Sequence, residues 1–397
     1  MGFTFWGLAR VQRKPRKICT ARFTLISTKG AEVMVALPWG RSAGRGATAD
    51  RVTGDRSGRA RLTILALVVF VMLAAIASLG TGAAGVSLGD VLVKWLSGEV
   101  LSVRDRVVLF DIRLPRLLTG MLVGASLAVS GAVMQGLFRN PLADPGIVGV
   151  GAGAGLGAVL AIVLGAFLPP AILAVAGMHL VPLAAFFGGW ATTLILYRVS
   201  TRAGRTSVAT MLLAGIALGA LSGALTGILV YIADDQQLRD LTFWGLGSLA
   251  GASWAKLAAA APIMVLALLV APMLARALNG LALGEGAAAH LGIAVQRMKN
   301  LAILTVAAAT GAAVAVSGGI GFIGIVVPHL LRLVMGPDHR FLLPAAALLG
   351  AGLLLLADII SRLIIAPAEL PIGIVTAVLG GPVFLWILLR RRGIVDM

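Results

Sequence analysis

The stretch that decides the fold is Arg113–Gly157, RLPRLLTGMLVGASLAVSGAVMQGLFRNPLADPGIVGVGAGAGLG. Its first apolar half, Leu117–Leu137, is long enough to cross a bilayer as a helix. The polar joint FRNPLADP follows at 138–145, where two prolines and the charged Arg139 and Asp144 predict an interruption. Alternating glycines then begin a second apolar half and allow close helix packing. The stretch therefore predicts two spanning helices that meet at a polar turn.

The whole chain has the composition of a membrane protein. Hydrophobic residues make up 59% of its 397 residues and charged residues 12%, whereas soluble domains have about 25% charged residues. Glycine accounts for 51 residues, which suits helices that pack closely in lipid. We therefore expect an all-α integral membrane protein.

Residues 1–62 form a basic segment before the first apolar run. They hold 13 Lys and Arg against three acids, so +10 of the net charge of +17 lies here. The segment lacks hydrophobic periodicity, so we expect a disordered cytoplasmic tail, with Met34 as an alternative start residue. No basic fold with interleaved aromatic residues is evident, so no nucleic-acid partner is expected. The single cysteine, Cys19, excludes an internal disulfide framework.

Apolar runs in the remaining sequence predict ten transmembrane helices in one domain, 63–392. The eighth run is short and contains Pro328. The expected spans are 63–80, 117–137, 147–167, 179–198, 208–232, 255–275, 298–317, 320–334, 343–362 and 372–389.

The distribution of basic residues predicts the orientation of these helices. An even number of spans places both termini on one side of the membrane. With the N-terminus inside, 25 Lys and Arg fall on the inner side and eight on the outer side. The bias predicts that both termini are cytoplasmic.

Three connecting segments are longer than turns. The outer segment 81–112 contains SLGDVLVKWLSG, which predicts a short surface helix, and a second outer loop covers 233–254. The inner segment 277–297 has short, weakly amphipathic pieces separated by glycines. It predicts one or two helices at the membrane surface that are available to a partner, and a simple solvated loop is the alternative.

Charged residues near the spans are costly in lipid and therefore informative. Asp358 and Arg362 are four residues apart, so they share a helix face and can pair. One interpretation is a structural ion pair near the outer surface. The other is a basic rim, completed by Arg113 and Arg116, that receives carboxylates from a soluble protein.

Several functional motifs are missing from the sequence. The chain has no G-x-x-x-x-G-K-[ST] motif that would hold ATP. Its four histidines lack metal-site spacing, and no order of Ser, His and Asp suggests a hydrolase. We therefore expect no catalytic residue, no metal site and no cofactor in this chain.

Several motifs in order resemble the permease subunits of the iron-chelate and vitamin B12 ABC importer family, from about Thr63 to Arg392. They are the stretch at 113–155, LLAGIALGALSG at 212–223, QQLRDLTFWGLGSLAG at 236–251, SGGIGFIGIVVPHLLRLVMGPDHRFLLPAAALLGAGLLLLADIISR at 317–362, and ELPIGIVTAVLGGPVFLWILL at 369–389.

The resemblance implies a type II ABC importer permease of ten helices in the bacterial cytoplasmic (inner) membrane. It further implies a homodimer with the translocation path at its interface. Two ATP-binding-cassette ATPase subunits would bind inside and use ATP and Mg, and a periplasmic or lipoprotein substrate-binding protein would dock outside. The chain itself would be a transport subunit and not an enzyme.

The resemblance also implies residue roles. The arginines that receive the binding protein match Arg113, Arg116 and Arg362. The cytoplasmic gate matches Ser207, Val208 and Ala209, where vitamin B12 permeases have small hydroxyl residues. Coupling to the ATPase falls in 277–297, and the expected contact residues are Leu283, Gly284, Glu285, Ala288, Leu291 and Gly292.

The substrate suggested by the resemblance is an iron complex. The outer stretch ADDQQLRDLTFWGLGSLAG is similar to haem-type permeases, which favours haem over a ferric siderophore. Cobalamin is the alternative, and the departure at the gate speaks against it. A function of another class is an ion-driven secondary transporter, for which Asp358 is nearly the only candidate carboxylate.

Overall fold

The computed structural model describes residues 56–82, 85–202 and 205–390, and these residues are mostly helical. Residues 1–55 of the expected disordered tail 1–62, with Cys19 and Met34, lie outside the described residues. The first helix, α1 (Ser57–Gly80), begins six residues before the predicted boundary at 63 and includes Arg59 and Arg61. These two arginines lie in its first turns, where their long side chains can still reach the polar edge of the membrane.

Within the described residues, eight helical segments are long and apolar enough to cross a membrane, and two shorter apolar helices complete the predicted ten. The all-α architecture is confirmed. The eight are α1 (Ser57–Gly80), Val103–Phe138, Val150–Phe167, α7 (Leu180–Ser200), α8 (Val208–Ile232), Trp254–Ala282, α13 (Val295–Ser317) and α15 (His339–Leu363). The two shorter helices are α14 (Ile323–Met335), which continues through Pro328, and α16 (Ile372–Arg390).

Three of the long segments combine several kinds of helix. The first joins α3 (Val103–Arg106), the π-helix η1 (Val107–Arg113) and α4 (Leu114–Phe138). The second joins α5 (Val150–Leu164) and η3 (Gly165–Phe167). The third joins α10 (Trp254–Val270), η5 (Ala271–Leu274) and α11 (Ala275–Ala282). Proline at position 272 removes one backbone donor, which accounts for the tighter turn of η5.

Short elements fill the connections. The predicted surface helix is confirmed as α2 (Leu88–Leu96), and α11 with α12 (Glu285–His290) confirms the predicted short helices of the inner segment. The others are η2 (Pro145–Val148), α6 (Pro170–Ala176), η4 (Gly177–His179) and the antiparallel strands β1 (Thr201–Arg202) and β2 (Arg205–Thr206).

The outer loop at 233–254 contains a helix that the apolar pattern does not predict, α9 (Asp235–Leu246). Asp234 caps it by accepting from the backbone N–H of Gln237 at 2.8 Å, while the Gln237 side chain accepts from the Asp234 backbone at 3.1 Å. This capping box marks the start of the helix. A search for apolar spans misses the helix because many of its residues are polar.

Helix α4 lies at the centre of the packing, and 21 of its residues are buried. It packs against α15, α13, α14 and α10. A Cβ atom at Gly131 would come within 3.0 Å of the Gly324 backbone on α14, and one at Gly124 would meet Gly350 on α15 equally closely. Small residues therefore let the backbones of these helices touch, as expected for helices associating in lipid.

The polar joint at 138–145 forms the predicted turn. Arg139 ends α4 in the left-handed conformation, with φ of 51°. The Asn140 side chain then accepts from the Leu142 backbone N–H at 2.9 Å, and Asp144 accepts from the Gly146 N–H at 2.8 Å. Local side-chain caps thus satisfy the backbone where the helix is broken.

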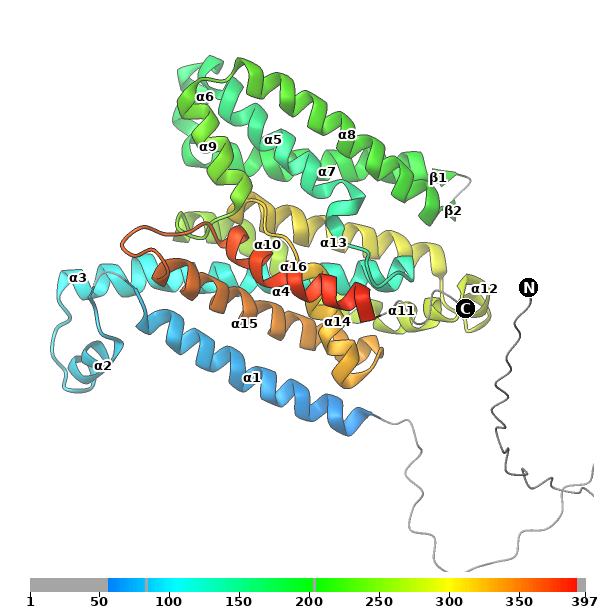
Figure 1. Ribbon diagram of the computed structural model, residues 1–397, viewed down its shortest axis with the longest axis horizontal. Coiled ribbons are helices and arrows are strands. Elements are labelled where there is room, and N and C mark those ends of the chain that lie inside the picture. The colour runs from blue at the N-terminus through cyan, green and yellow to red at the C-terminus, as the bar shows by residue number, and fades with distance from the viewer. Residues whose placement is uncertain (1–55, 83–84, 203–204, 391–397) are drawn as a thin grey trace, which may run out of the picture. The chain divides into compact units, whose positions relative to one another are not determined.

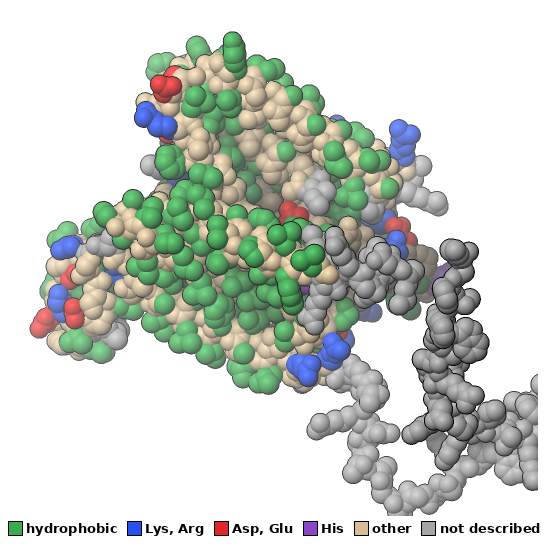
Figure 2. Space-filling view, viewed as in Figure 1, with side chains coloured by type: hydrophobic (Ala, Val, Ile, Leu, Met, Phe, Trp, Pro, Cys, Tyr) green, Lys and Arg blue, Asp and Glu red, His purple; other side chains and the backbone are tan. Residues whose placement is uncertain are grey.

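The connections gather at two opposite ends of the helices (Figure 1). One end carries α2, α3, α9 and the α15–α16 connection, and the other carries β1, β2, α11, α12 and the α14–α15 turn. Figure 2 shows hydrophobic side chains over the middle of the visible face and charged side chains gathered toward its ends. We call these ends the outer end and the inner end, following the predicted orientation.

Candidate functional site

The outer end contains a buried charge cluster centred on Arg116 of α4. The Arg116 Nη2 atom donates to Asp358 Oδ1 on α15 at 2.8 Å, and its Nη1 atom donates to Glu369 Oε1 at 2.8 Å. The side chains of Arg116 and Asp358 are only 8% and 1% exposed, whereas Glu369 is 37% exposed. One arginine thus joins α4, α15 and the α15–α16 connection.

Two more arginines extend this cluster to the end of α1. Arg362 Nη1 donates to the Thr81 carbonyl at 2.9 Å and its Nη2 donates to Ser78 Oγ at 3.0 Å. Arg113 Nη1 donates to the Leu79 carbonyl at 2.6 Å. Cations favour the C-terminal end of a helix, where the last carbonyls lack partners within the helix. The two guanidinium groups therefore fix α1 to α4 and α15.

The structure brings together the three arginines that sequence reasoning selected. The predicted pair is confirmed, with Arg362 Nη2 at 3.1 Å from Asp358 Oδ2. The three are buried within the chain, so they do not form the fully exposed rim that an outside carboxylate would meet directly. Glu369 was missed because nothing in its sequence position signals a contact with Arg116, 253 residues away.

The inner end presents α11 and α12, which the resemblance assigns to contact with an ATPase. Leu283 and Leu291 are 70% and 64% exposed, which is unusual for large apolar side chains. The Glu285 side chain is 50% exposed, and Gly292 is exposed too, while Gly284 is partly exposed. Gly284 is the N-cap of α12, and its φ of 106° lets the chain turn between the two helices.

Ala288 differs from the other five predicted contact residues because it is fully buried. It lies 3.7 Å from where a Cβ atom at Gly280 would be. The Ala288 side chain therefore presents no surface to a partner in this arrangement. Ala288 instead holds α12 against α11, and the exposed surface of the segment is carried by its neighbours.

The predicted gate residues begin α8 at the same end. Ser207 is the N-cap of α8, and its side chain accepts from the Thr210 backbone N–H at 3.3 Å. Ala209 is exposed, and the side chain of Val208 lies outside the described residues. Thr206 precedes them and is bound by Gln296 and by the buried Lys299 of α13. Sequence reasoning missed these contacts, although a lysine inside the apolar run of α13 is itself a signal.

A second polar group lies between α4 and α14 near the inner end. The Gln135 amide donates to the Gly324 carbonyl at 3.1 Å and accepts from Arg332, so this side chain joins α4 to α14. The Asn140 side chain accepts from the Leu142 backbone N–H within the joint. Burial raises the pKa of the neighbouring Asp144 carboxyl, which its hydrogen bond from Gly146 only partly offsets.

The α14–α15 turn is fixed by Asp338. The Arg340 guanidinium donates to this carboxylate at 2.7 and 2.9 Å and lowers the pKa of Asp338 to about 2. Asn279 of α11 also donates to Asp338 at 2.7 Å. The contact therefore joins the segment assigned to coupling to the start of α15.

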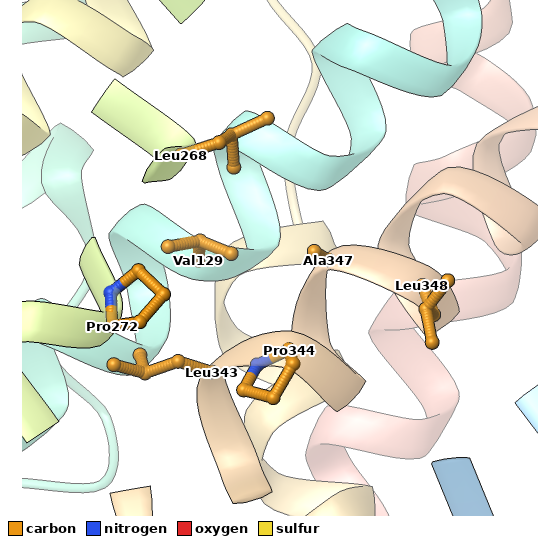
Figure 3. A pocket seen from close by; sticks show the side chains of 7 residues that line it. All are labelled: Val129, Leu268, Pro272, Leu343, Pro344, Ala347 and Leu348. Carbon is orange, nitrogen blue, oxygen red and sulfur yellow. The ribbon is translucent and has the colours of Figure 1, made fainter. Parts of the chain in front are cut away.

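A hollow of about 320 Å³ opens between α4, α10, η5 and α15 (Figure 3). The side chains that line it are all apolar, and they belong to Val129, Leu268, Pro272, Leu343, Pro344, Ala347 and Leu348. Ligand sites usually add a few polar groups that fix orientation. The hollow therefore does not fit a polar metal complex. Among the described residues, no three His, Cys, Asp or Glu side chains are grouped to hold a metal ion.

The sequence matches known transport proteins over most of its length. The model of the FecCD transport family matches residues 67–390. A hemin transport system permease protein, HmuU of Yersinia pestis, is 46% identical over 84% of this chain and 96% of its own. A vitamin B12 import system permease protein, BtuC of Shigella boydii, is 44% identical over 83% of this chain and 95% of its own.

A solved structure supports the same relationship. It is described as a metal-chelate type ABC transporter in an inward-facing conformation. The two folds superpose with a TM-score of 0.73 at 33% sequence identity, over 83% of this chain and 99% of the other. The arrangement of helices described above is therefore that of an importer permease.

Proposed function

The chain belongs to the FecCD transport family, whose members are permease subunits of ABC importers, and from this premise we propose that it carries an iron complex, with haem as the first candidate, across the bacterial cytoplasmic membrane. The observation that carries the proposal is the difference between its two ends. The outer end has a buried cluster of arginines and carboxylates, and the inner end has a short-helix segment with exposed leucines. In this proposal, the two ends serve different partners.

The inner end is the surface for two ATP-binding-cassette ATPase subunits. Exposed Leu283 and Leu291 would lose contact with water on association, and their apolar area supplies the driving force. ATP and Mg are used by those subunits, since this sequence has no P-loop. The chain itself needs no cofactor and catalyses no reaction.

The outer end receives a substrate-binding protein. The network holds three guanidinium groups against two carboxylates, Asp358 and Glu369, so positive charge is in excess. Arg113 Nη2 has no hydrogen-bond partner among the described residues. That atom is buried, so a carboxylate of the binding protein would reach the network at Arg116, by replacing the partly exposed Glu369. Arg113, Arg116 and Arg362 then act as a prepared receptor rather than as a free rim.

A second copy of the chain completes the path. Helix α8 exposes several large apolar side chains, among them Leu213 (69%), Ile216 (64%) and Tyr231 (90%). We assign this face to the homodimer, with the gate at Ser207, Val208 and Ala209 closing the path on the cytoplasmic side. Both termini would be cytoplasmic, as the basic residues predict.

Cobalamin is the second candidate substrate. The vitamin B12 permease is nearly as similar to this chain as the hemin permease, at 44% against 46% identity. Haem and cobalamin are both metal-centred macrocycles, so one path of similar width could suit either. A ferric siderophore fits the metal-chelate description of the structural relative.

The proposal is tested by purifying the chain from its native membrane in mild detergent and identifying what is bound. An ATPase and a binding protein should co-purify, and the ligand extracted from that binding protein should be haem. Extraction of a corrinoid would replace haem with cobalamin. Recovery of the chain alone under conditions that preserve other ABC complexes would overturn the partner proposal.

A further inference from the structure

Lys299 is a buried cation that the transport path itself does not explain. It lies in the second turn of α13 and is 3% exposed. Its ammonium group donates to Glu285 Oε1 at 2.7 Å and to the Thr206 carbonyl oxygen at 3.1 Å. A buried charge is costly unless it is paired and hydrogen-bonded, so these two acceptors fix its position.

Thr206 is held by α13 at three atoms. Besides the bond from Lys299 to its carbonyl, its backbone N–H donates to Gln296 Oε1 at 3.0 Å and its Oγ1 accepts from Gln296 Nε2 at 2.6 Å. Thr206 ends β2 and directly precedes Ser207, the N-cap of α8. The position of the start of α8 is therefore set by α13.

Glu285 lies on the other side of the same ammonium group. It is the first residue of α12, which packs against α11 and α13. Because Lys299 bonds both Glu285 and Thr206, a single side chain links α12 to the residue before the gate. Helix α13 carries this lysine on a well-packed core element with 14 buried residues.

We propose that Lys299 is a positioning residue that makes α12 and the start of α8 move together. The inference rests on the proposed function, in which α12 bears on an ATPase and the start of α8 is the gate. Moving α12 alone would separate Glu285 from a buried ammonium, which is unfavourable. Moving α12 together with α13 and β2 keeps both acceptors on the lysine and keeps the bonds between Gln296 and Thr206, so a displacement at the ATPase surface reaches the gate.

The test uses the complete transporter, reconstituted in proteoliposomes with its ATPase and binding protein, and compares uptake with ATP hydrolysis. Lys299→Met removes the charge and keeps an apolar stem. Lys299→Arg keeps a cation that can reach both acceptors. Arg198→Met is the control, because Arg198 is an exposed arginine near the end of α7 and lies outside the coupling segment.

The expected result for Lys299→Met is an assembled complex that hydrolyses ATP while uptake per ATP falls about fivefold or more. Lys299→Arg should restore much of the ratio, and Arg198→Met should leave it unchanged. A purely structural role would lower the yield of the complex without changing this ratio. Unchanged uptake per ATP in Lys299→Met would overturn the proposal.

Glu285→Gln keeps the test decisive if Lys299→Met does not fold. Its side chain is half exposed, so the variant should fold and should also lower uptake per ATP, and an unchanged ratio would count against the inference. Failure of the proposed function looks different. In that case, the unaltered chain would not assemble with an ATPase or would not import in an ATP-dependent manner.

Discussion

Replacing Asp358 with asparagine is expected to destabilise the protein because Asp358 is the shared partner of two buried arginines. Its carboxylate lies 2.8 Å from Arg116 Nη2 and 3.1 Å from Arg362 Nη2, and its side chain is only 1% exposed. Removing one partner of a buried ion pair costs about 3–5 kcal/mol, because the other charge stays buried without compensation.

The lower end of this range applies to Asp358→Asn. Arg116 keeps the Glu369 carboxylate, and Arg362 keeps its bonds to the carbonyls at the end of α1. We therefore expect a loss of about 3 kcal/mol in the free energy of unfolding. Arg340→Gln is the control, since its ion pair with Asp338 has an arginine side chain that is 66% exposed, and such pairs contribute about 0–1 kcal/mol.

Equilibrium unfolding of the purified permease in detergent micelles, followed by circular dichroism, measures both variants. Asp358→Asn should lower the unfolding midpoint clearly more than Arg340→Gln does. Equal effects of the two variants would show that the outer cluster is not a buried, energetically coupled network, and the argument from burial would be wrong.

Three further predictions address packing, pH and the inner surface. Gly131→Ala should destabilise the protein by at least about 1–3 kcal/mol in the same assay, because its Cβ would collide with the Gly324 backbone. Gly151→Ala is the control and should be neutral, because a Cβ atom there meets nothing within 4 Å. Equal effects of the two variants would refute the close contact of α4 with α14. The pKa of Asp338 in the folded protein is lowered from 3.8 to about 2, so its contribution to stability is present above pH 4 and is lost as the pH falls to about 2. The unfolding midpoints of Asp338→Asn and of the unaltered protein should therefore differ at pH 5 and converge near pH 2. A difference that stays constant with pH would contradict this. Leu283→Asp should abolish co-purification of the ATPase without lowering the unfolding midpoint, because the side chain is 70% exposed, whereas retention of the ATPase would exclude this leucine from the contact.

The spanning helices could be predicted from the sequence because lipid requires long apolar runs. The pair Asp358 and Arg362 could also be predicted, since a spacing of four residues places both on one helix face. The interruption at 138–145 followed from its prolines in the same local way. In each case, the decisive physics lies within a few neighbouring residues.

Contacts between distant residues could not be predicted in this way. Arg116 and Asp358 are separated by 242 positions, and only the packing of α4 against α15 brings them together. The same holds for Lys299 and Thr206, 93 positions apart. Exposure was equally hidden, because the family resemblance that selected Ala288 with Leu283 and Leu291 does not distinguish a buried alanine from exposed leucines. Helix α9 is different, because its capping box at Asp234 and Gln237 is visible in the sequence.

The central claim is that this chain is the permease of an ATP-driven importer of an iron complex, and uptake by reconstituted proteoliposomes tests it most directly. Vesicles that contain the chain and its ATPase, supplied with haem-loaded binding protein, should accumulate haem only when ATP is inside. Omitting either partner should abolish accumulation. Uptake that persists without the ATPase and follows an imposed ion gradient would contradict the claim and would favour a secondary transporter.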